Sequence, residues 1–483
     1  MKILLFFLIL SVLPLSIAAQ QKSLDRRYVP IIVSEFRDTD LQGLEIDEWS
    51  AFAYDSEKDE WTCQPIQFDE KDHKDRYNRD DQERLIDDND ELVVMPGDLG
   101  DRASRAEWLP GSNADERIEL VFTDPLNPAD SAWLYLYPQS ASDSSYFSYT
   151  AAPPDMPAAD TVKTAVYHVG HNERGWLDFI SLSSDFNIDL IDRIKLRLAG
   201  ENSVFGISPY VLDEDLIQSG DKPVEFNQGK VRSFQKISLK IDISALNFPG
   251  IDSVSSPYSF EYFPYSFKTS AETELEPGQL AFFGLDHIRQ SLDFSPFAQG
   301  MSFYSSSNPQ GLTIDGMPDD IDTTLPENAA YNWIMISGDK GTILTLFDLP
   351  EISLAITELY YQDDKTASMG TDSTLDTGDS ESWGDGGIWI HATGDAVKLS
   401  SRLEISFIGY LLPETNRNAA FAEKITAWQA HPVNMTAEKQ TFSASFVAES
   451  RQRPKQHRVI SLYPNPYSAD NSAAINLKTR YQK

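Results

Sequence analysis

The chain contains almost no cysteine and little histidine. Its single cysteine, Cys63, excludes an intramolecular disulfide bond in a protein of 483 residues. The 7 histidines are spread thinly, and there is no Gly-x-Ser-x-Gly elbow, no glycine-rich phosphate loop and no His-Glu-x-x-His motif. Stability must therefore come from buried apolar cores, or from bound metal, rather than from cross-links through sulfur.

Positive charge is also scarce. The chain has 40 Lys and Arg residues against 75 Asp and Glu residues, which gives a formal net charge of −35. Such a surface repels nucleic acid phosphates and anionic lipid headgroups, so nucleic acid is not an expected partner, whereas cations are. Hydrophobic residues make up 41% of the chain and aromatic residues 11%, which is enough for packed cores.

Long hydrophobic runs are absent except at the N-terminus. Lys2 precedes an apolar stretch at 3–17, which closes on the small residues Ser16, Ala18 and Ala19. This pattern predicts a secretory signal peptide at 1–19, with an uncleaved N-terminal anchor as the alternative. We expect the protein to be secreted or held at a bacterial cell surface, with no membrane span after cleavage.

The apolar pattern predicts a mainly β protein. Polar turns at 55–60 and 123–130 divide two hairpins, at 49–68 and 117–137. Other strands are expected at 28–35, where Pro30 favours a sheet edge, and at 64–70, 92–95, 193–198, 237–243, 333–337, 341–347, 387–391 and 403–411. Helical patterns occur only at 415–428 and, more weakly, at 211–218. We predict antiparallel β-sandwich domains with long acidic loops and few short helices.

The composition divides the chain into domains. A stretch rich in alanine and proline at 151–160 predicts a linker. It separates an N-terminal β domain with an acidic loop, at 20–150, from a large β-sandwich domain at 161–448. A basic segment and tail follow at 449–483.

Acidic residues concentrate between Phe68 and Glu91. Calcium needs about six to eight oxygen ligands on a compact loop, and alternating carboxylates can supply several of them. The candidate metal ligands are Asp87, Asp88, Asp90 and Glu91, although their spacing does not match the twelve-residue helix-flanked calcium loop. The alternative is a solvated acidic loop without metal.

Clusters of aromatic residues indicate either a carbohydrate surface or a sheet core. Six rings occur within Tyr258–Phe267, and two more pairs border the acidic stretch at 362–386. Flat rings beside carboxylates suit the faces and hydroxyl groups of sugars. Alternating aromatics can equally fill the interior of a sheet. The candidate ligand-binding residues are Tyr360, Tyr361, Trp383 and Trp389.

Isolated reactive side chains give weaker signals. Cys63 lies in an expected strand between Trp61 and Pro65, which favours a buried thiol over a nucleophile. His168 and His171 would point to opposite faces of a strand, so they could share a metal only if Gly170 provides a turn.

Two segments resemble known groups of exported bacterial proteins. The run Leu-Tyr-Pro-Asn-Pro-Tyr at 462–467 resembles the opening of the C-terminal sorting domain of type IX secretion substrates, although the family domain continues through further strands. This resemblance implies secretion machinery as a partner and export to the cell surface. The segments 64–70 and 90–102 resemble exported bacterial β-proteins of unknown activity, which implies a fold neighbourhood only.

These observations favour a non-catalytic exported protein. We expect it to bind carbohydrate or extracellular matrix through aromatic and acidic loops, with calcium as the candidate cofactor. The alternative is a polysaccharide-active enzyme, a lyase or hydrolase. A cleft that brings Tyr, His and Arg together with two carboxylates would favour the enzyme.

Overall fold

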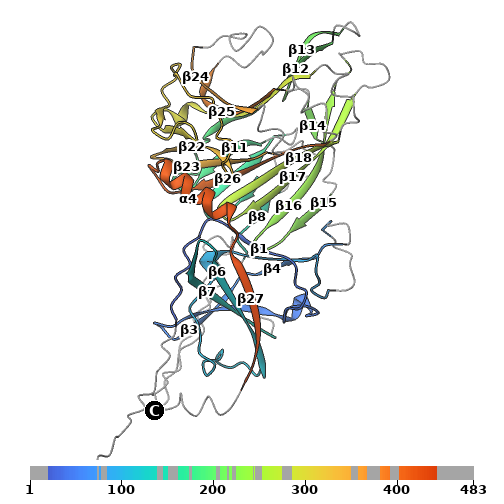
Figure 1. The fold of residues 1–483 in the computed structure, drawn as a ribbon, viewed down its shortest axis with the longest axis vertical. Helices are drawn as coiled ribbons and strands as arrows, with labels where there is room; N and C mark the ends of the chain where they lie inside the picture. The colour runs from blue at the N-terminus through green and yellow to red at the C-terminus, as the bar shows by residue number, and fades with distance from the viewer. Residues whose placement is uncertain are drawn as a thin grey trace, which may run out of the picture.

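Antiparallel β-sheets form almost all of the regular structure, as the sequence predicts. The computed structural model describes residues 20–72, 76–77, 84–138, 145–150, 161–172, 177–202, 207–214, 217–219, 225–242, 244, 253–274, 285–349, 357–366, 381–391 and 402–442. The predicted signal peptide, the linker at 151–160 and the sorting segment lie outside these residues. The described strands pair in antiparallel fashion, and Figure 1 shows a smaller group of sheets beside a larger one.

The smaller group, which we call the N-terminal part, consists of residues 20–138 and one strand from the C-terminal region. Its main sheet has five strands, in the order β27 (Asn434–Thr441), β6 (Glu116–Asp124), β7 (Asn127–Tyr137), β2 (Ser50–Asp55) and β3 (Glu60–Gln64). A second sheet has three strands, in the order β1 (Ile31–Val33), β5 (Glu91–Val94) and β4 (Gln67–Asp69). Two short 3₁₀ helices also belong to this part: η1 (Ile46–Glu48) precedes β2, and η2 (Pro96–Asp98) follows β5. The two predicted hairpins are β2–β3 and β6–β7, and β1 lies at a sheet edge as Pro30 indicates.

Alternation along β7 gives the main sheet two different faces. Leu134 and Leu136 pack into an aliphatic core shared with the three-stranded sheet. Trp133, Tyr135 and Tyr137 point the other way into an aromatic core with Trp61.

The larger group, which we call the sandwich, has three sheets. The ten-stranded sheet runs β14 (Ile217–Ser219), β16 (Ser233–Asp242), β17 (Ser253–Phe263), β18 (Ser266–Glu274), β26 (Arg402–Leu412), β23 (Gly341–Asp348), β22 (Asn332–Gly338), β20 (Ser302–Ser305) and β21 (Leu312–Thr313), with β15 (Glu225–Gln228) also paired to β16. The five-stranded sheet runs β13 (Ile207–Asp213), β12 (Ile191–Asn202), β19 (Leu285–Phe294), β25 (Ser382–His391) and β24 (Thr357–Asp364). The four-stranded sheet runs β11 (Leu177–Leu182), β10 (Tyr167–His171), β9 (Thr161–Lys163) and β8 (Ser148–Thr150), and the short helix η5 (Pro296–Ala298) follows β19.

Both faces of the ten-stranded sheet are covered around β22. Ile334 and Ile336 pack into the main core against the five-stranded sheet. Trp333 and Met335, which alternate with them, pack instead against helix α4 (Ala419–Ala430). The helix confirms the prediction at 415–428 and ends shortly before Pro432, as proline requires.

Two segments differ from the expectation. The helix predicted at 211–218 is wrong, because β13 and β14 cover most of that range. Pairing with β12 turns Tyr210 and Leu212 inward and leaves Val211 half-buried, which is strand alternation imposed by tertiary contacts. Strand β27, in the range expected for the second domain, pairs with β6 instead (Figure 1).

The N-terminal part meets the sandwich along a seam with an apolar centre. Val93 and Met95, at the end of β5, pack against Val231, which precedes β16, and Phe263, which ends β17 in the ten-stranded sheet. Within the described residues, no helix has the length and apolar character needed to cross a membrane.

Candidate ligand-binding site

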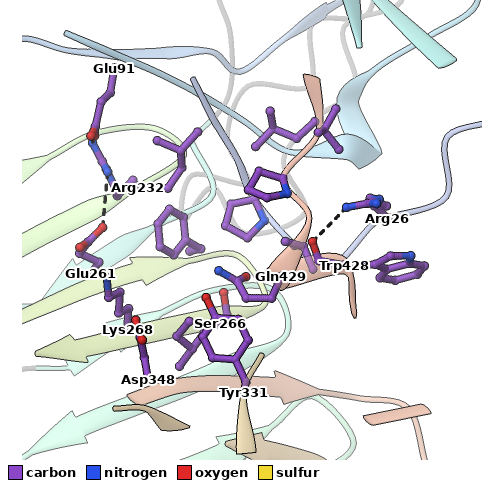
Figure 2. A pocket seen from close by; sticks show the side chains of 18 of the residues that line it. Arg26, Glu91, Arg232, Glu261, Ser266, Lys268, Tyr331, Asp348, Trp428 and Gln429 are labelled. Atoms are coloured by element: carbon purple, nitrogen blue, oxygen red, sulfur yellow. Dashed lines mark hydrogen bonds and ion pairs between the residues drawn. The ribbon is translucent and has the colours of Figure 1, made fainter. Parts of the chain in front are cut away.

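A pocket of about 320 Å³ lies on the seam, beside the apolar centre (Figure 2). Its volume falls at the lower end of the range of roughly 300–1,000 Å³ that is usual for small-ligand sites, which often lie where domains meet. Strand β1, the start of β5, the end of β17, the start of β18 and the turn after α4 all line it. The pocket therefore depends on both parts of the molecule.

One wall of the pocket carries charges of alternating sign. Figure 2 shows Glu91, Arg232, Glu261, Lys268 and Asp348 following one another along this wall, which we call the charged row. They come from β5, the turn before β16, β17, β18 and β23. The strands β16, β17 and β18 are neighbours in the ten-stranded sheet, β26 separates β18 from β23, and β5 belongs to the three-stranded sheet.

The lining of the pocket also includes apolar residues. Pro30, Ile31 and Ile32 belong to the edge strand β1 or precede it, and Val433 follows α4. Ile32 is 40% exposed, although most large apolar residues here are buried. The pocket thus offers a hydrocarbon surface as well as a row of charges.

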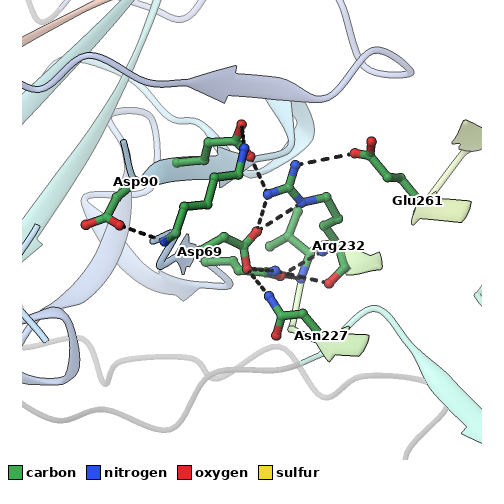
Figure 3. A network of polar contacts seen from close by, with 9 residues as sticks. Asp69, Asp90, Asn227, Arg232 and Glu261 are labelled. Carbon is green, nitrogen blue, oxygen red and sulfur yellow. Dashed lines mark hydrogen bonds and ion pairs between the residues drawn. The ribbon is translucent and has the colours of Figure 1, made fainter. Parts of the chain in front are cut away.

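Arg232 is the centre of a buried ionic network at one end of the row (Figure 3). Its Nε and Nη2 atoms donate to Asp69 Oδ2 at 2.9 and 2.5 Å, Nη2 also donates to Glu91 Oε2 at 2.5 Å, and Nη1 lies 3.4 Å from Glu261 Oε2. The Arg232 side chain is only 2% exposed. Its guanidinium also lies 5.0 Å from the centre of the Tyr77 ring, a cation–π distance.

Gln67 fixes the turn that presents Arg232. Its Oε1 accepts the backbone N–H groups of Val231 and Arg232, each at 2.8 Å, and its Nε2 donates to Asp69 Oδ1 at 2.7 Å. A Cβ atom at Gly229 would lie 2.0 Å from Gln67 Cδ, so a larger residue there would displace the Gln67 amide. The strand expected at 64–70 therefore includes β4, which holds the turn in place.

The network keeps its groups charged. Burial alone would raise the pKa of Glu91, but Arg232 and Lys71 lower that pKa below its ordinary value. Burial would lower the pKa of Arg232, and the surrounding carboxylates, with Asp69 first, raise it instead. This end of the pocket is therefore a fixed array of charges at neutral pH.

Lys268 and Asp348, at the other end of the charged row, are not part of the Arg232 network. Within the described residues, no hydrogen bond or ion pair involves Lys268 Nζ or the Asp348 carboxylate, and Lys268 is half-buried. Gln429 accepts a hydrogen bond from Tyr410 Oη at 2.7 Å, and Tyr331 lies beside it (Figure 2). These groups can meet a ligand without breaking the Arg232 network.

The four carboxylates predicted as metal ligands each have a partner within the protein. Asp90 is buried and accepts backbone N–H groups from Lys71 at 3.0 Å and Asp87 at 2.9 Å. Asp87 accepts the N–H of Asn89, Asp88 pairs with Arg37, and Glu91 pairs with Lys71 and Arg232. Among the described residues, no group of three or more His, Cys, Asp or Glu side chains is arranged to hold a metal. The centre of the acidic segment, at 73–75 and 78–83, lies outside them.

The predicted ligand-binding aromatics divide between two faces of the five-stranded sheet. Tyr360 and Trp389 lie on its outer face, with ring centres 6.1 Å apart, and His287 contacts Trp389. Tyr361 points inward against Phe303, whereas Trp383 lies near Lys365. Tyr360 and Trp389 therefore share the outer face of this sheet, whereas Tyr361 and Trp383 pack against the main core.

The other candidate residues belong mostly to cores. Tyr258 and most other rings of Tyr258–Phe267 are buried, which confirms the interpretation of a sheet interior. His171 is buried and bonded to Tyr262 Oη at 2.8 Å, while His168 stacks on Phe186. Cys63 is half-buried beside the aromatic core.

Sequence reasoning missed Arg232 and Lys268, the cations of the charged row. The alternation of polar residues along 233–242 and 253–263 was the only available signal, and it does not single out these two positions. No family model and no curated protein matches the chain.

Proposed function

We propose that the protein is an exported carbohydrate-binding protein and that the pocket on the seam is its binding site. The observation that carries this proposal is the charged row together with the apolar residues in the lining of one pocket. A sugar hydroxyl both donates and accepts hydrogen bonds. A row of alternating carboxylates and cations matches successive hydroxyl groups, while the C–H face of the sugar ring packs on Ile32 and Val433.

The Lys268 end of the row provides the contacts that decide affinity. The groups around Arg232 are committed to one another, so their geometry does not change when a ligand enters. Lys268 and Asp348 have hydrogen-bonding capacity to offer, and Gln429 adds an amide. We expect a terminal sugar or a short oligosaccharide to fill the pocket, given its volume of about 320 Å³.

Isothermal titration calorimetry with a panel of neutral and acidic oligosaccharides tests the proposal. For a sugar that binds, Lys268→Met and Asp348→Asn should each weaken binding about tenfold, which corresponds to about 1.4 kcal/mol. Asp339→Asn and Lys340→Met are matched controls at the opposite end of β23, and they should bind like the original protein. Binding by no sugar of the panel, or equal binding by all variants, would contradict the proposal.

Export is part of the proposal and has its own test. The sequence supports it through the apolar stretch before Gln20 and the resemblance at 462–467. In a bacterial host that exports the chain, we expect the mature N-terminus to lie near Gln20. Recovery of the protein from the cytosol with Met1–Ala19 still attached would contradict this expectation.

Calcium binding by the acidic segment stays a prediction. The four candidate ligands serve other partners in the structure, so a site would have to draw on the centre of the segment. A ligand that binds only the folded state raises the melting midpoint. A thermal melt with and without millimolar Ca²⁺ measures this, and an unchanged midpoint would remove calcium from the proposal.

The residues considered for catalysis do not share a site. His171 and Tyr262 lie inside the main core, and Trp389 lies on the outer face of the five-stranded sheet. This arrangement gives no support to the enzyme interpretation at these residues, and binding is the function that we carry forward.

A further inference from the structure

A second buried ionic cluster lies on the outer face of the five-stranded sheet, away from the seam. Lys195 Nζ is 2.8 Å from Asp293 Oδ2 and 3.5 Å from Asp385 Oδ2. The three side chains are 2%, 2% and 0% exposed. One amine and two carboxyl groups are therefore enclosed together without access to solvent.

The sheet register brings these three side chains together from three adjacent strands. Lys195 of β12 is paired with Ser291 of β19, so Asp293 is its diagonal neighbour on the same face. Asp385 precedes Gly386, which is paired with Leu292 of β19. Diagonal neighbours are within reach of a long side chain, so Lys195 meets Asp293 without distortion of the sheet.

Asp385 is poorly satisfied for a buried carboxyl group. Neither of its oxygens accepts a hydrogen bond from a described residue, although both are buried. An ionised carboxylate in such surroundings acts strongly on a neighbouring titratable group, because the low local dielectric screens its charge only weakly. Burial, followed by the charge of Asp385, raises the pKa of Asp293 well above its ordinary value, although Lys195 opposes this. The cluster therefore favours a neutral carboxyl group beside an amine.

We propose that Lys195 and Asp293 form an intramolecular amide cross-link, with Asp385 as the proton-transfer residue. The Nζ lone pair attacks Asp293 Cγ, a C–N bond forms and a C–O bond breaks. The Asp385 carboxylate takes a proton from the nitrogen and passes it to the departing hydroxyl oxygen of the neutral Asp293 carboxyl group, so one water molecule leaves and no oxidant is needed. Reacting atoms in a productive arrangement lie roughly 3–3.5 Å apart, and an amine 2.8 Å from a carboxyl oxygen lies near that separation from the carboxyl carbon.

The amide cross-link would stabilise a chain that has no disulfide bond to do so. A chain with one cysteine cannot form an intramolecular disulfide, even in an oxidising compartment. An amide between β12 and β19 closes a long loop of the chain, and such closure stabilises the folded state by restricting the unfolded one. Unlike a disulfide, an amide is not broken by reducing agents.

Intact mass spectrometry of the purified, denatured full chain tests the inference. The measured mass should be lower than the sequence mass of the same N-terminus by one water molecule. After proteolysis, a branched peptide should join the segment around Lys195 to the segment around Asp293. The full sequence mass, or a water loss that maps to another position, would overturn the inference and leave an ordinary buried ion pair.

Variants identify the roles of the three residues. Lys195→Arg keeps the charge but cannot form this amide. Asp385→Asn keeps both reacting groups but lacks the carboxyl group that transfers the proton. Both variants should therefore retain the full mass. Asp286→Asn, on the same strand with a carboxylate 59% exposed, should lose water like the original protein. A full cross-link in Asp385→Asn would refute the role of Asp385. If Lys195→Arg does not fold, the mass of the original chain still decides the inference.

Discussion

The two buried ionic clusters are both built around one cation, but their hydrogen bonding differs. Each places one cation among more than one carboxylate, with side chains of the central pair only 2% exposed. Around Arg232, the nearest carboxylate receives two N–H groups, and Glu91 and Glu261 surround the same guanidinium. Around Lys195, Asp293 is at hydrogen-bonding distance, whereas Asp385 lies farther away and is left without a hydrogen bond from a described residue.

The difference follows from the shapes of the two cations. A guanidinium is a planar fork with five donors, so it can bind several carboxylates in one plane. An ammonium is a point charge with three donors, and a second carboxylate beside it competes with the first. The arginine cluster therefore holds Glu91 ionised and links the N-terminal part to the sandwich. The lysine cluster instead favours a proton on Asp293, which is the state that the proposed amide formation requires.

Removing the arginine should have the largest effect. Arg232→Met leaves Asp69 and Glu91 buried on the seam without their main cation. Breaking a buried pair by removing one partner typically costs 3–5 kcal/mol, roughly, and we expect a loss in that range. Urea unfolding at neutral pH measures it through the transition midpoint. A loss below about 1 kcal/mol would mean that the network does not hold the two parts together.

Asp98 is a buried carboxyl group on the same seam, and its pKa is raised where that of Glu91 is lowered by Arg232. Its Oδ1 accepts a hydrogen bond from Tyr146 Oη at 2.5 Å, its Oδ2 has no described partner, and the nearby Lys22 donates to backbone carbonyl groups instead. Burial raises the pKa of Asp98 to about 7, against the opposing effects of Tyr146 and Lys22. Because the folded pKa lies above the unfolded value, the stabilising contribution of protonation is gained as the pH falls through 7 and is lost above it.

Asp98→Asn should therefore be more stable than the original protein at pH 8, by roughly 1–3 kcal/mol. The advantage should shrink by pH 5, where the original side chain is protonated. Urea midpoints of both proteins at the two pH values measure the difference. An advantage that stays constant with pH would contradict the assignment of the proton to Asp98.

Within the arginine cluster, the contacts should differ in strength. Glu261 is the most exposed of the three carboxylates around Arg232, at 18%, and its contact is the longest, at 3.4 Å. Glu261→Gln should cost about 0.5–1 kcal/mol, because partial solvation screens the lost charge. The measurement is the urea midpoint, and a loss as large as that of Arg232→Met would show that all three contacts are equivalent.

The smallest effect is expected from an exposed pair. Arg84 and Asp47 lie 2.7 Å apart, and their side chains are 71% and 70% exposed. Arg84→Met should change the unfolding free energy by less than about 0.5 kcal/mol. This variant is also the matched control for Arg232→Met, since both replace an ion-paired arginine by methionine. A larger change would show that exposure does not distinguish the two arginines.

Local patterns predicted much of the fold. The alternation of Ile118, Leu120 and Phe122 places them in the aliphatic core, and the alanine-rich helix before Pro432 forms where expected. Prediction failed at 211–218, where pairing with β12 overrides a weak helical pattern.

The candidate site was harder to predict because its partners are distant in sequence. Asp69 and Glu91 stand out in an acidic segment, but Arg232 lies 163 residues beyond Asp69. A run of carboxylates indicates a cation without saying whether a metal or an arginine supplies it. Tyr360 and Trp389, two of the predicted ligand-binding residues, lie close together because their strands β24 and β25 are adjacent, and their role in binding stays a prediction.

The return of β27 to the N-terminal sheet imposes an order on folding. Strand β6 is complete early in synthesis, but its neighbour at 434–441 emerges only after the whole sandwich has been made. Until then β6 presents an open hydrogen-bonding edge, which is a hazard for misassembly. Such a long sequence separation also slows folding. The N-terminal sheet can therefore be completed only after residues 434–441 have been made, so its folding is coupled to the synthesis of nearly the whole described chain.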